Sequence, residues 1–231
     1  WGLFAASLAL AQDYEVVHAF SGADGQPSGR LLLQPDGSLL GTASRDGECG
    51  LGSVFVLRPG KGRDFQYEEL HTFCGLDGSL PSGNLTLGPD GFWYGTTYSG
   101  GPSDQGTVFK VDSHGRLTTV HAFDGGEAGQ NPGPELLFAN DGFLYGAAGG
   151  GLDGAGFLFR IDAQGSYSVF HAFDWSDGAG PNTPLIQALD GNFYGTTGGG
   201  PAGHGPLDGS TIFRIDPAGT LTTLHVTTES E

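Results

Sequence analysis

The chain has 231 residues, of which 44 are glycine, 13 are proline and none is methionine, and only 15% are charged. So much glycine disfavours helices and suits tight turns, whereas 16 phenylalanines and a hydrophobic share of 37% exclude a disordered chain. The net charge of −17 argues against binding to nucleic acid phosphates. The length is typical of one large all-β domain.

The N-terminal segment 1–12 reads W-G-L-F-A-A-S-L-A-L-A-Q, an apolar run that closes on small residues. This pattern is typical of the end of a secretory signal peptide, and the run is too short to span a bilayer. We therefore expect an exported protein, secreted/extracellular or periplasmic, without a transmembrane segment. The alternative is an ordinary apolar N-terminal strand that docks on the same or a neighbouring subunit.

From Tyr14 onward the chain is a tandem repeat with a period of about 50 residues, which indicates a propeller, a solenoid or an array. Three features mark the copies: a histidine (His18, His71, His121, His171, His225), an Asp-Gly turn (Asp36, Asp90, Asp141, Asp190) and a phenylalanine in a V-F-K-V-D-like block (Phe55, Phe109, Phe159, Phe213). A β-solenoid is disfavoured, because its repeats are usually much shorter.

Each copy predicts four short antiparallel strands, A to D, separated by turn residues. In the second copy these are 85–87, 92–97, 107–111 and 117–123. Such a unit is apolar on both faces and can bury them only between two like units, as a propeller blade does. The four phenylalanines of strand C are accordingly predicted to be buried between blades.

The fold class predicted is therefore an all-β β-propeller of four-stranded antiparallel blades, forming a single domain over 13–231. The blades are expected at 31–73, 85–123, 135–173 and 185–226, with an extra D-like strand at 14–20. Four blades are favoured, with the extra strand closing the last one. The alternative is that the chain is part of a larger propeller and 14–20 is the tail of a missing blade.

The combination G-T-V-F-K-V-D, G-R-L-T-T-V-H-A-F and D-G-F-W-Y-G-T-T resembles the Gloeo/Verruco tandem repeat of secreted bacterial proteins. The resemblance covers about residues 14 to 226. It implies an exported, propeller-like repeat protein. It implies no particular reaction or catalytic residue.

The strand order predicts which loops share an end of the molecule. Strands B and D run the same way, so the B–C and D–A loops lie on one face and the A–B and C–D turns on the other. The first is the predicted binding face. Tyr98 and Trp175 lie in its loops, where sugar rings stack on exposed aromatic side chains. Both are predicted ligand-binding residues; the alternative is ordinary packing.

Each D–A loop also carries an acidic residue four positions after its histidine-containing strand ends: Asp24, Asp77, Glu127 and Asp177. Oxygen-rich loops of this kind suit Ca²⁺. An aspartate before glycine is also common turn chemistry, because its side chain bonds the backbone two residues on. The turn interpretation is favoured, so no cofactor is expected, with Ca²⁺ bound by these four residues as the alternative. The A–B turn aspartates are predicted turn formers.

Histidine and cysteine are two further residue types that can carry chemistry. The histidines occur once per blade and should lie apart, whereas metal or triad chemistry requires convergence. Cys49 and Cys74 fall in loops on the same face of one blade. In an exported protein they predict a disulfide rather than free thiols.

No nucleotide loop, Gly-x-Ser-x-Gly elbow or zinc signature occurs in the sequence. The favoured function is an extracellular, non-catalytic binding module whose partner is carbohydrate or another protein. One alternative is a secreted polysaccharide hydrolase or lyase with acidic residues at the propeller mouth. The other is a self-assembling filament or surface-layer subunit. The sequence leaves open whether the protein is an enzyme, and a non-enzyme is favoured.

Overall fold

The computed structural model describes residues 16–21, 25–45, 47–62, 64–127, 129–151, 154–181, 183–200 and 209–227. All regular structure in this part of the chain is β-strand, arranged as four antiparallel sheets in chain order. No helix occurs in these ranges, and so none in them is long and apolar enough to cross a membrane. The predicted all-β class with antiparallel four-stranded units is confirmed.

The strands have the following bounds. Sheet 1 contains β1 (Gln26–Leu33), β2 (Leu39–Ser44), β3 (Ser53–Pro59) and β4 (Phe65–Thr72); sheet 2 contains β5 (Ser79–Pro81), β6 (Thr86–Leu87), β7 (Trp93–Ser99), β8 (Thr107–Val111) and β9 (Leu117–Ala122). Sheet 3 contains β10 (Gln130–Pro132), β11 (Leu137–Phe138), β12 (Leu144–Gly149), β13 (Phe157–Ile161) and β14 (Tyr167–Ala172); sheet 4 contains β15 (Ala179–Pro181), β16 (Ile186–Gln187), β17 (Phe193–Gly199), β18 (Thr211–Ile215) and β19 (Leu221–Val226).

The sheets differ from the sequence prediction at their first strand. In sheet 2, β8 matches the predicted strand C, but strand A begins earlier than residue 85, because β5 already pairs with β7. Leu80, in the middle of β5, has a φ of 53° and precedes a proline. Proline has no N–H for the ladder, so this segment resembles a loop in sequence. The left-handed conformation of Leu80 also turns the strand.

A glycine facing a phenylalanine organises each sheet. The two residues are cross-strand partners in every sheet: Gly41 and Phe55, Gly95 and Phe109, Gly146 and Phe159, Gly195 and Phe213. A Cβ atom on any of these glycines would lie only 2.4 to 2.7 Å from the phenylalanine ring. All four phenylalanines are buried. The repeated glycine therefore makes room for the ring, and the predicted burial of strand C is confirmed.

Neighbouring sheets pack through these rings. The phenylalanine directly after one sheet's last strand meets the next sheet's buried ring, with centroids 5.1 Å apart for Phe73 and Phe109 and 5.5 Å apart for Phe173 and Phe213. Phe20 contacts Phe55 in the same way at 5.2 Å. The described part of the predicted extra strand, Val16 to Phe20, is not β-strand, yet it covers sheet 1 as the end of a preceding blade would.

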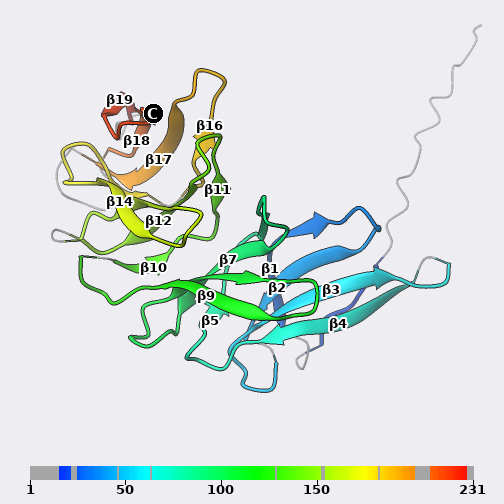
Figure 1. Cartoon of the computed structure of the whole chain (residues 1–231). Helices are drawn as coiled ribbons and strands as arrows, with labels where there is room; N and C mark the ends of the chain where they lie inside the picture. Colours follow the sequence, from blue (N-terminus) through cyan, green and yellow to red (C-terminus); the bar gives the residue numbers. More distant parts are fainter. Residues whose placement is uncertain are drawn as a thin grey trace, which may run out of the picture.

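The four sheets form an arc that does not close into a ring. Figure 1 shows them in chain order, from sheet 1 in blue and cyan to sheet 4 in orange and red, with the two ends apart. Positions that are buried inside the arc are exposed at its ends. Leu31 of sheet 1 is 41% exposed, whereas its equivalents Leu85, Leu136 and Leu185 are 3%, 7% and 6% exposed. Ile212 of sheet 4 is 43% exposed, whereas Val54, Val108 and Leu158 are at most 1% exposed.

Candidate functional site: a groove on the predicted binding face

A groove of about 590 Å³ lies on the face formed by the B–C and D–A loops. Sheets 2, 3 and 4 all contribute to it, through the end of β7, through β10 and through β15. Its polar and ring-bearing side chains are Ser82, Tyr98, Gln130, Asn131, Pro132, Pro134 and Pro181. The remaining lining is mostly glycine, which leaves backbone groups accessible to a ligand.

Main-chain hydrogen bonds between sheets fix the floor of this groove. The amide of Asn131 donates to the carbonyl oxygen of Gln105 at 2.7 Å, and the amide of Gly180 donates to the carbonyl oxygen of Ala155 at 2.7 Å. Leu80 makes the equivalent bond to Leu51 at 2.8 Å. Each bond ties the first strand of one sheet to the B–C loop of the preceding sheet. The first strands that line the groove are therefore anchored to the neighbouring sheet by main-chain hydrogen bonds.

Tyr98 is the exposed aromatic residue of the groove. Its side chain is 49% exposed, and its carbonyl accepts a hydrogen bond from Nδ2 of Asn131 at 2.9 Å. The equivalent residues of the other sheets are small: Ser44, Gly149 and Gly198. Since the fold works with small residues at this position, packing does not require the tyrosine ring.

Trp175, the second aromatic residue predicted to bind ligand, lies elsewhere on this face. It is half-buried, packs against the hydrophobic cluster of sheets 3 and 4, and is outside the groove lining. Its φ of 68° is unusual for a bulky residue, and the equivalent residues of sheets 2 and 3 are glycines, Gly75 and Gly125. A non-glycine residue held in this conformation costs on the order of 1 kcal/mol or more. Strained backbone conformations cluster at functional sites. For this reason the ligand-binding role of Trp175 stays a prediction.

The acidic residues predicted in the D–A loops make local contacts where the structure describes them. Asp24 lies outside the described residues. Asp77 pairs with His71 at 2.8 Å between Oδ2 and Nε2, and Asp177 pairs with His171 at the same distance. The second carboxylate oxygen of each accepts an amide of its own loop, from Cys74 at 3.0 Å and from Asp174 at 3.2 Å. Both amides lie three residues before the aspartate, whereas the turn interpretation expected a bond to the backbone two residues after it.

Glu127, the remaining member, lies exposed in its loop. Within the described ranges, no three histidine, cysteine or acidic side chains come together in a way that could hold a metal ion. Asp77, Glu127 and Asp177 are thus not gathered into one group, and the Ca²⁺ alternative stays a prediction.

His121 occupies a different environment from His71 and His171. Its ring stacks on Tyr167 with centroids 3.9 Å apart, and its buried Nε2 atom has no hydrogen-bond partner. Burial lowers the pKa of His121, partly offset by the charge of Asp124. Burial also raises the pKa of the Tyr167 hydroxyl. His71, His121 and His171 therefore each make contacts of their own rather than converging on a common site.

The A–B turn aspartates are confirmed as turn formers. Their Oδ1 atoms accept the amide two residues on, from Ser38 at 2.9 Å, Phe92 at 3.3 Å, Phe143 at 3.1 Å and Asn192 at 3.0 Å. Sheets 2, 3 and 4 add a tyrosine hydroxyl to the same carboxylate, from Tyr94, Tyr145 and Tyr194. Burial and the hydrogen bond to Asp141 raise the pKa of Tyr145 to about 12.

The predicted disulfide is confirmed. Cys49 and Cys74 are bonded, with Cα atoms 5.3 Å apart, and they join the B–C loop of sheet 1 to the loop that follows β4. Closing a loop with a sequence separation of 25 contributes on the order of 3 kcal/mol. Disulfides persist outside the reducing cytosol, so the bond indicates a non-cytoplasmic location.

Sequence reasoning missed Gln130, Asn131 and the groove prolines, because it placed them in a loop of unspecified shape. A usable pattern was present: a proline recurs at Pro81, Pro132 and Pro181 in the same place of each D–A segment. A fixed proline in a variable loop marks a fixed backbone, and here the proline of each sheet packs over a glycine of the preceding one.

The fold and the groove define a propeller-like array of tandem β-sheets. A Gloeobacter/Verrucomicrobia repeat model matches residues 3–147, which is more than half of the chain. The protein belongs to this Gloeobacter/Verrucomicrobia repeat family. No curated protein sequence matches the chain.

Several solved structures share the fold at low sequence identity. A gluconolactonase of Xanthomonas campestris is 15% identical, with a TM-score of 0.54 over 86% of this chain and 61% of its own length. A luciferin-regenerating enzyme is 13% identical, with a TM-score of 0.53 over 89% and 64%. The hydrazine synthase of Kuenenia stuttgartiensis is 15% identical, with a TM-score of 0.55 over 86% and 54%. This chain therefore spans less than two thirds of each, and the likeness concerns the fold alone.

Proposed function

We propose that the protein is an exported, non-catalytic module that binds carbohydrate through the groove of Tyr98. The observation that carries the proposal is the exposed ring of Tyr98 at a position where the other sheets have Ser44, Gly149 and Gly198. Sugars stack their apolar faces on such rings, and the amide of Gln130 supplies both a donor and an acceptor for hydroxyl groups. Export is supported by the Cys49–Cys74 disulfide.

Binding is proposed ahead of hydrolysis because of the chemistry of the lining. Glycoside hydrolysis uses two carboxylates that flank the scissile bond. Apart from Ala148, the side chains described around the groove are two amides, a phenol, the hydroxyl of Ser82 and prolines. They suit recognition of hydroxyl groups rather than proton transfer.

A glycan array, run with and without Ca²⁺ beside an assay of reducing-sugar release, tests the proposal. We expect wild-type protein to bind a defined set of glycans and Tyr98→Ala to lose that binding. Leu76→Ala is the matched control, because Leu76 is an exposed apolar residue of the same face outside the groove. Wild-type binding that survives Tyr98→Ala would contradict the proposal. Release of reducing sugar would instead favour the hydrolase alternative.

A second candidate function is head-to-tail self-association, in which two arcs together complete a larger propeller. It is favoured by the exposure of Leu31 and Ile212 at opposite ends of the arc. Inside the arc, the hydroxyls of Thr42 and Thr96 donate to carbonyl oxygens of the next sheet, at 3.0 and 2.8 Å. The equivalent Thr196 of sheet 4 instead bonds Thr183, which precedes β16 of the same sheet. Different faces that fit one another produce rings or filaments.

The mass of the protein in solution, measured by light scattering over a range of concentrations, tests this second function. We expect a mass above that of the monomer which Ile212→Asp reduces to the monomer value. Leu76→Asp, an equally drastic change on an exposed residue away from both ends, should leave the mass unchanged. A monomer at all concentrations would exclude self-association.

A further inference from the structure

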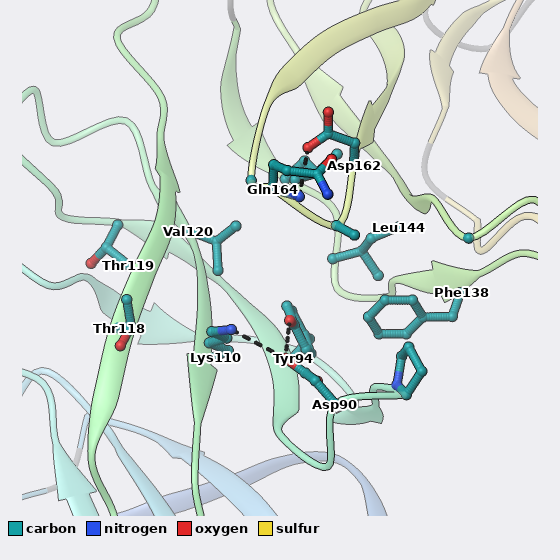
Figure 2. Close-up of a pocket in the computed structure, with 15 residues that line it drawn as sticks. Asp90, Tyr94, Lys110, Thr118, Thr119, Val120, Phe138, Leu144, Asp162 and Gln164 are labelled. Atoms are coloured by element: carbon teal, nitrogen blue, oxygen red, sulfur yellow. Dashed lines mark hydrogen bonds and ion pairs between the residues drawn. The ribbon is translucent and has the colours of Figure 1, made fainter.

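A second cavity lies on the opposite side of the molecule from the groove, between sheets 2 and 3. It has a volume of about 330 Å³ and is bordered by the A–B turns of both sheets and the C–D turn of sheet 3. Figure 2 shows its two polar walls: Lys110, Asp90 and Tyr94 on one, and Asp162 with Gln164 on the other. Val120, Leu144 and Phe138 lie between them.

The repeat provides an internal reference for this cavity. At the corresponding corner between sheets 3 and 4, three aromatic rings fill the space. The centroid of Tyr145 lies 5.0 Å from that of Phe170 and 4.5 Å from that of Phe193. Between sheets 2 and 3, Val120 stands in the place of Phe170 and Leu144 in the place of Phe193. Phe138 in turn stands in the place of Gln187. The cavity therefore lies where the next interface has the rings of Phe170 and Phe193, and Phe138 lines one side of it.

The remaining aromatic residues of the cavity keep an arrangement suited to a further ring. Tyr94 and Phe138 pack edge to face, with centroids 5.0 Å apart. The Tyr94 hydroxyl donates to Oδ2 of Asp90 at 2.9 Å, which holds the tyrosine in place. Aromatic rings gain free energy from such edge-to-face and offset contacts. A planar ring entering the cavity would meet both side chains.

The charges of the lining select against an anionic ligand. Asp90 and Asp162 contribute two negative charges and Lys110 one positive charge. Nζ of Lys110 already pairs with Oδ2 of Asp90 at 3.1 Å. Burial alone would lower the pKa of Lys110, but its hydrogen bond to Asp90 raises it, so the ammonium stays charged. Its remaining N–H groups can donate to a hydroxyl oxygen, and the Asp162 carboxylate can accept a hydroxyl proton.

We propose that this cavity is a binding site for a small, neutral aromatic molecule that carries a hydroxyl group. The ring takes the space left by the two missing phenylalanines. The hydroxyl meets Lys110 or Asp162 at a polar wall. The site is independent of the carbohydrate groove, since the two have no lining residue in common.

Calorimetric titration of the full chain with phenol tests the proposal, together with thermal unfolding in its presence. We expect saturable binding and a rise in Tm with phenol concentration. The double variant Val120→Phe/Leu144→Phe places at these two positions the rings that the next interface has, and it should bind phenol about tenfold more weakly or not at all. The single variant Val120→Phe serves if the double variant does not fold.

Three results would overturn the site. One is the absence of any phenol-dependent heat or Tm shift in wild-type protein. Another is undiminished phenol binding by a folded variant with the cavity filled. The third is tighter binding of benzoate than of phenol, which would contradict the charge argument. The Tyr98→Ala variant should bind phenol as wild type does, which separates this test from that of the groove.

Discussion

The interface between sheets 2 and 3 and the interface between sheets 3 and 4 use the same core with different flanks. In both, a phenylalanine ends one sheet and packs on the buried phenylalanine of the next, at 5.6 Å for Phe123 and Phe159 and 5.5 Å for Phe173 and Phe213. On the loop side, His171 has Asp177 as a partner, whereas His121 stacks on a tyrosine. On the turn side, aromatic rings fill the corner between sheets 3 and 4, whereas the corner between sheets 2 and 3 contains the cavity.

The length of the D–A loop accounts for the difference between the partners of His171 and His121. The loop after Phe173 reaches its proline in eight residues, Asp174 to Pro181, whereas the loop after Phe123 takes nine, Asp124 to Pro132. Both loops start with the same turn, in which the amide of Gly126 bonds Asp124 and the amide of Ser176 bonds Asp174. In the longer loop, however, the exposed Glu127 does not take the place of Asp177. The same phenylalanine core is therefore compatible with different side-chain contacts on both sides of it.

The largest effect is expected from breaking the shared core. Phe159→Ala and Phe213→Ala should each lower the free energy of unfolding by about 3–5 kcal/mol, because each removes a buried ring and leaves a cavity. Chemical denaturation measures both values. A loss below about 1 kcal/mol for either variant would show that the two interfaces do not share this core.

The next effect comes from exchanging the turn-side corners. Phe170→Val/Phe193→Leu gives the interface of sheets 3 and 4 the residues of its neighbour and should cost about 2–4 kcal/mol, since it opens a cavity. Such a variant should also acquire space for an aromatic ligand. The reverse exchange, Val120→Phe/Leu144→Phe, should raise Tm. A fall in Tm for the reverse exchange would mean that the open corner lacks room for the rings.

A smaller effect is expected from the loop-side pair. Asp177→Asn removes the charge that faces His171 and should cost about 1 kcal/mol, because the hydrogen bond is charge-assisted and only partly exposed. The matched change at the other interface, Glu127→Gln, should be nearly silent, since Glu127 is exposed. Denaturant titration at neutral pH compares the two. Equal losses would show that Glu127 also supports its interface.

The smallest effect is a pH dependence confined to the interface of sheets 2 and 3. Burial lowers the pKa of His121 in the folded protein, so the unfolded chain takes up a proton first, near its ordinary pKa of about 6.5. Stability should therefore fall as the pH drops below that value. His121→Phe keeps the ring stack without the proton. Unfolding measured between about pH 7.5 and 5 should show a smaller loss for the variant than for wild type, and parallel curves would contradict this.

Features that depend on residues close in the chain could be predicted from the sequence. The β8 strand, the Asp-Gly turns and the order of the sheets all follow from alternation and turn chemistry within one repeat. Strand β5 was missed because Leu80 and Pro81 resemble a loop. Of the candidate site, Tyr98 could be predicted as an aromatic residue in a binding-face loop, but its partners Gln130 and Asn131 could not, because they belong to the next repeat.

By itself, the sequence determined the all-β class, the repeat, the buried phenylalanines and the pairing of Cys49 with Cys74. These depend on periodicity and on loops that meet within one sheet. Only the tertiary structure decided that the arc stays open, that a groove forms beside Tyr98, and that a cavity lies beside Val120. The physical reason is that volumes and partners at an interface depend on side chains of two different repeats, whose fit is set only when the sheets pack.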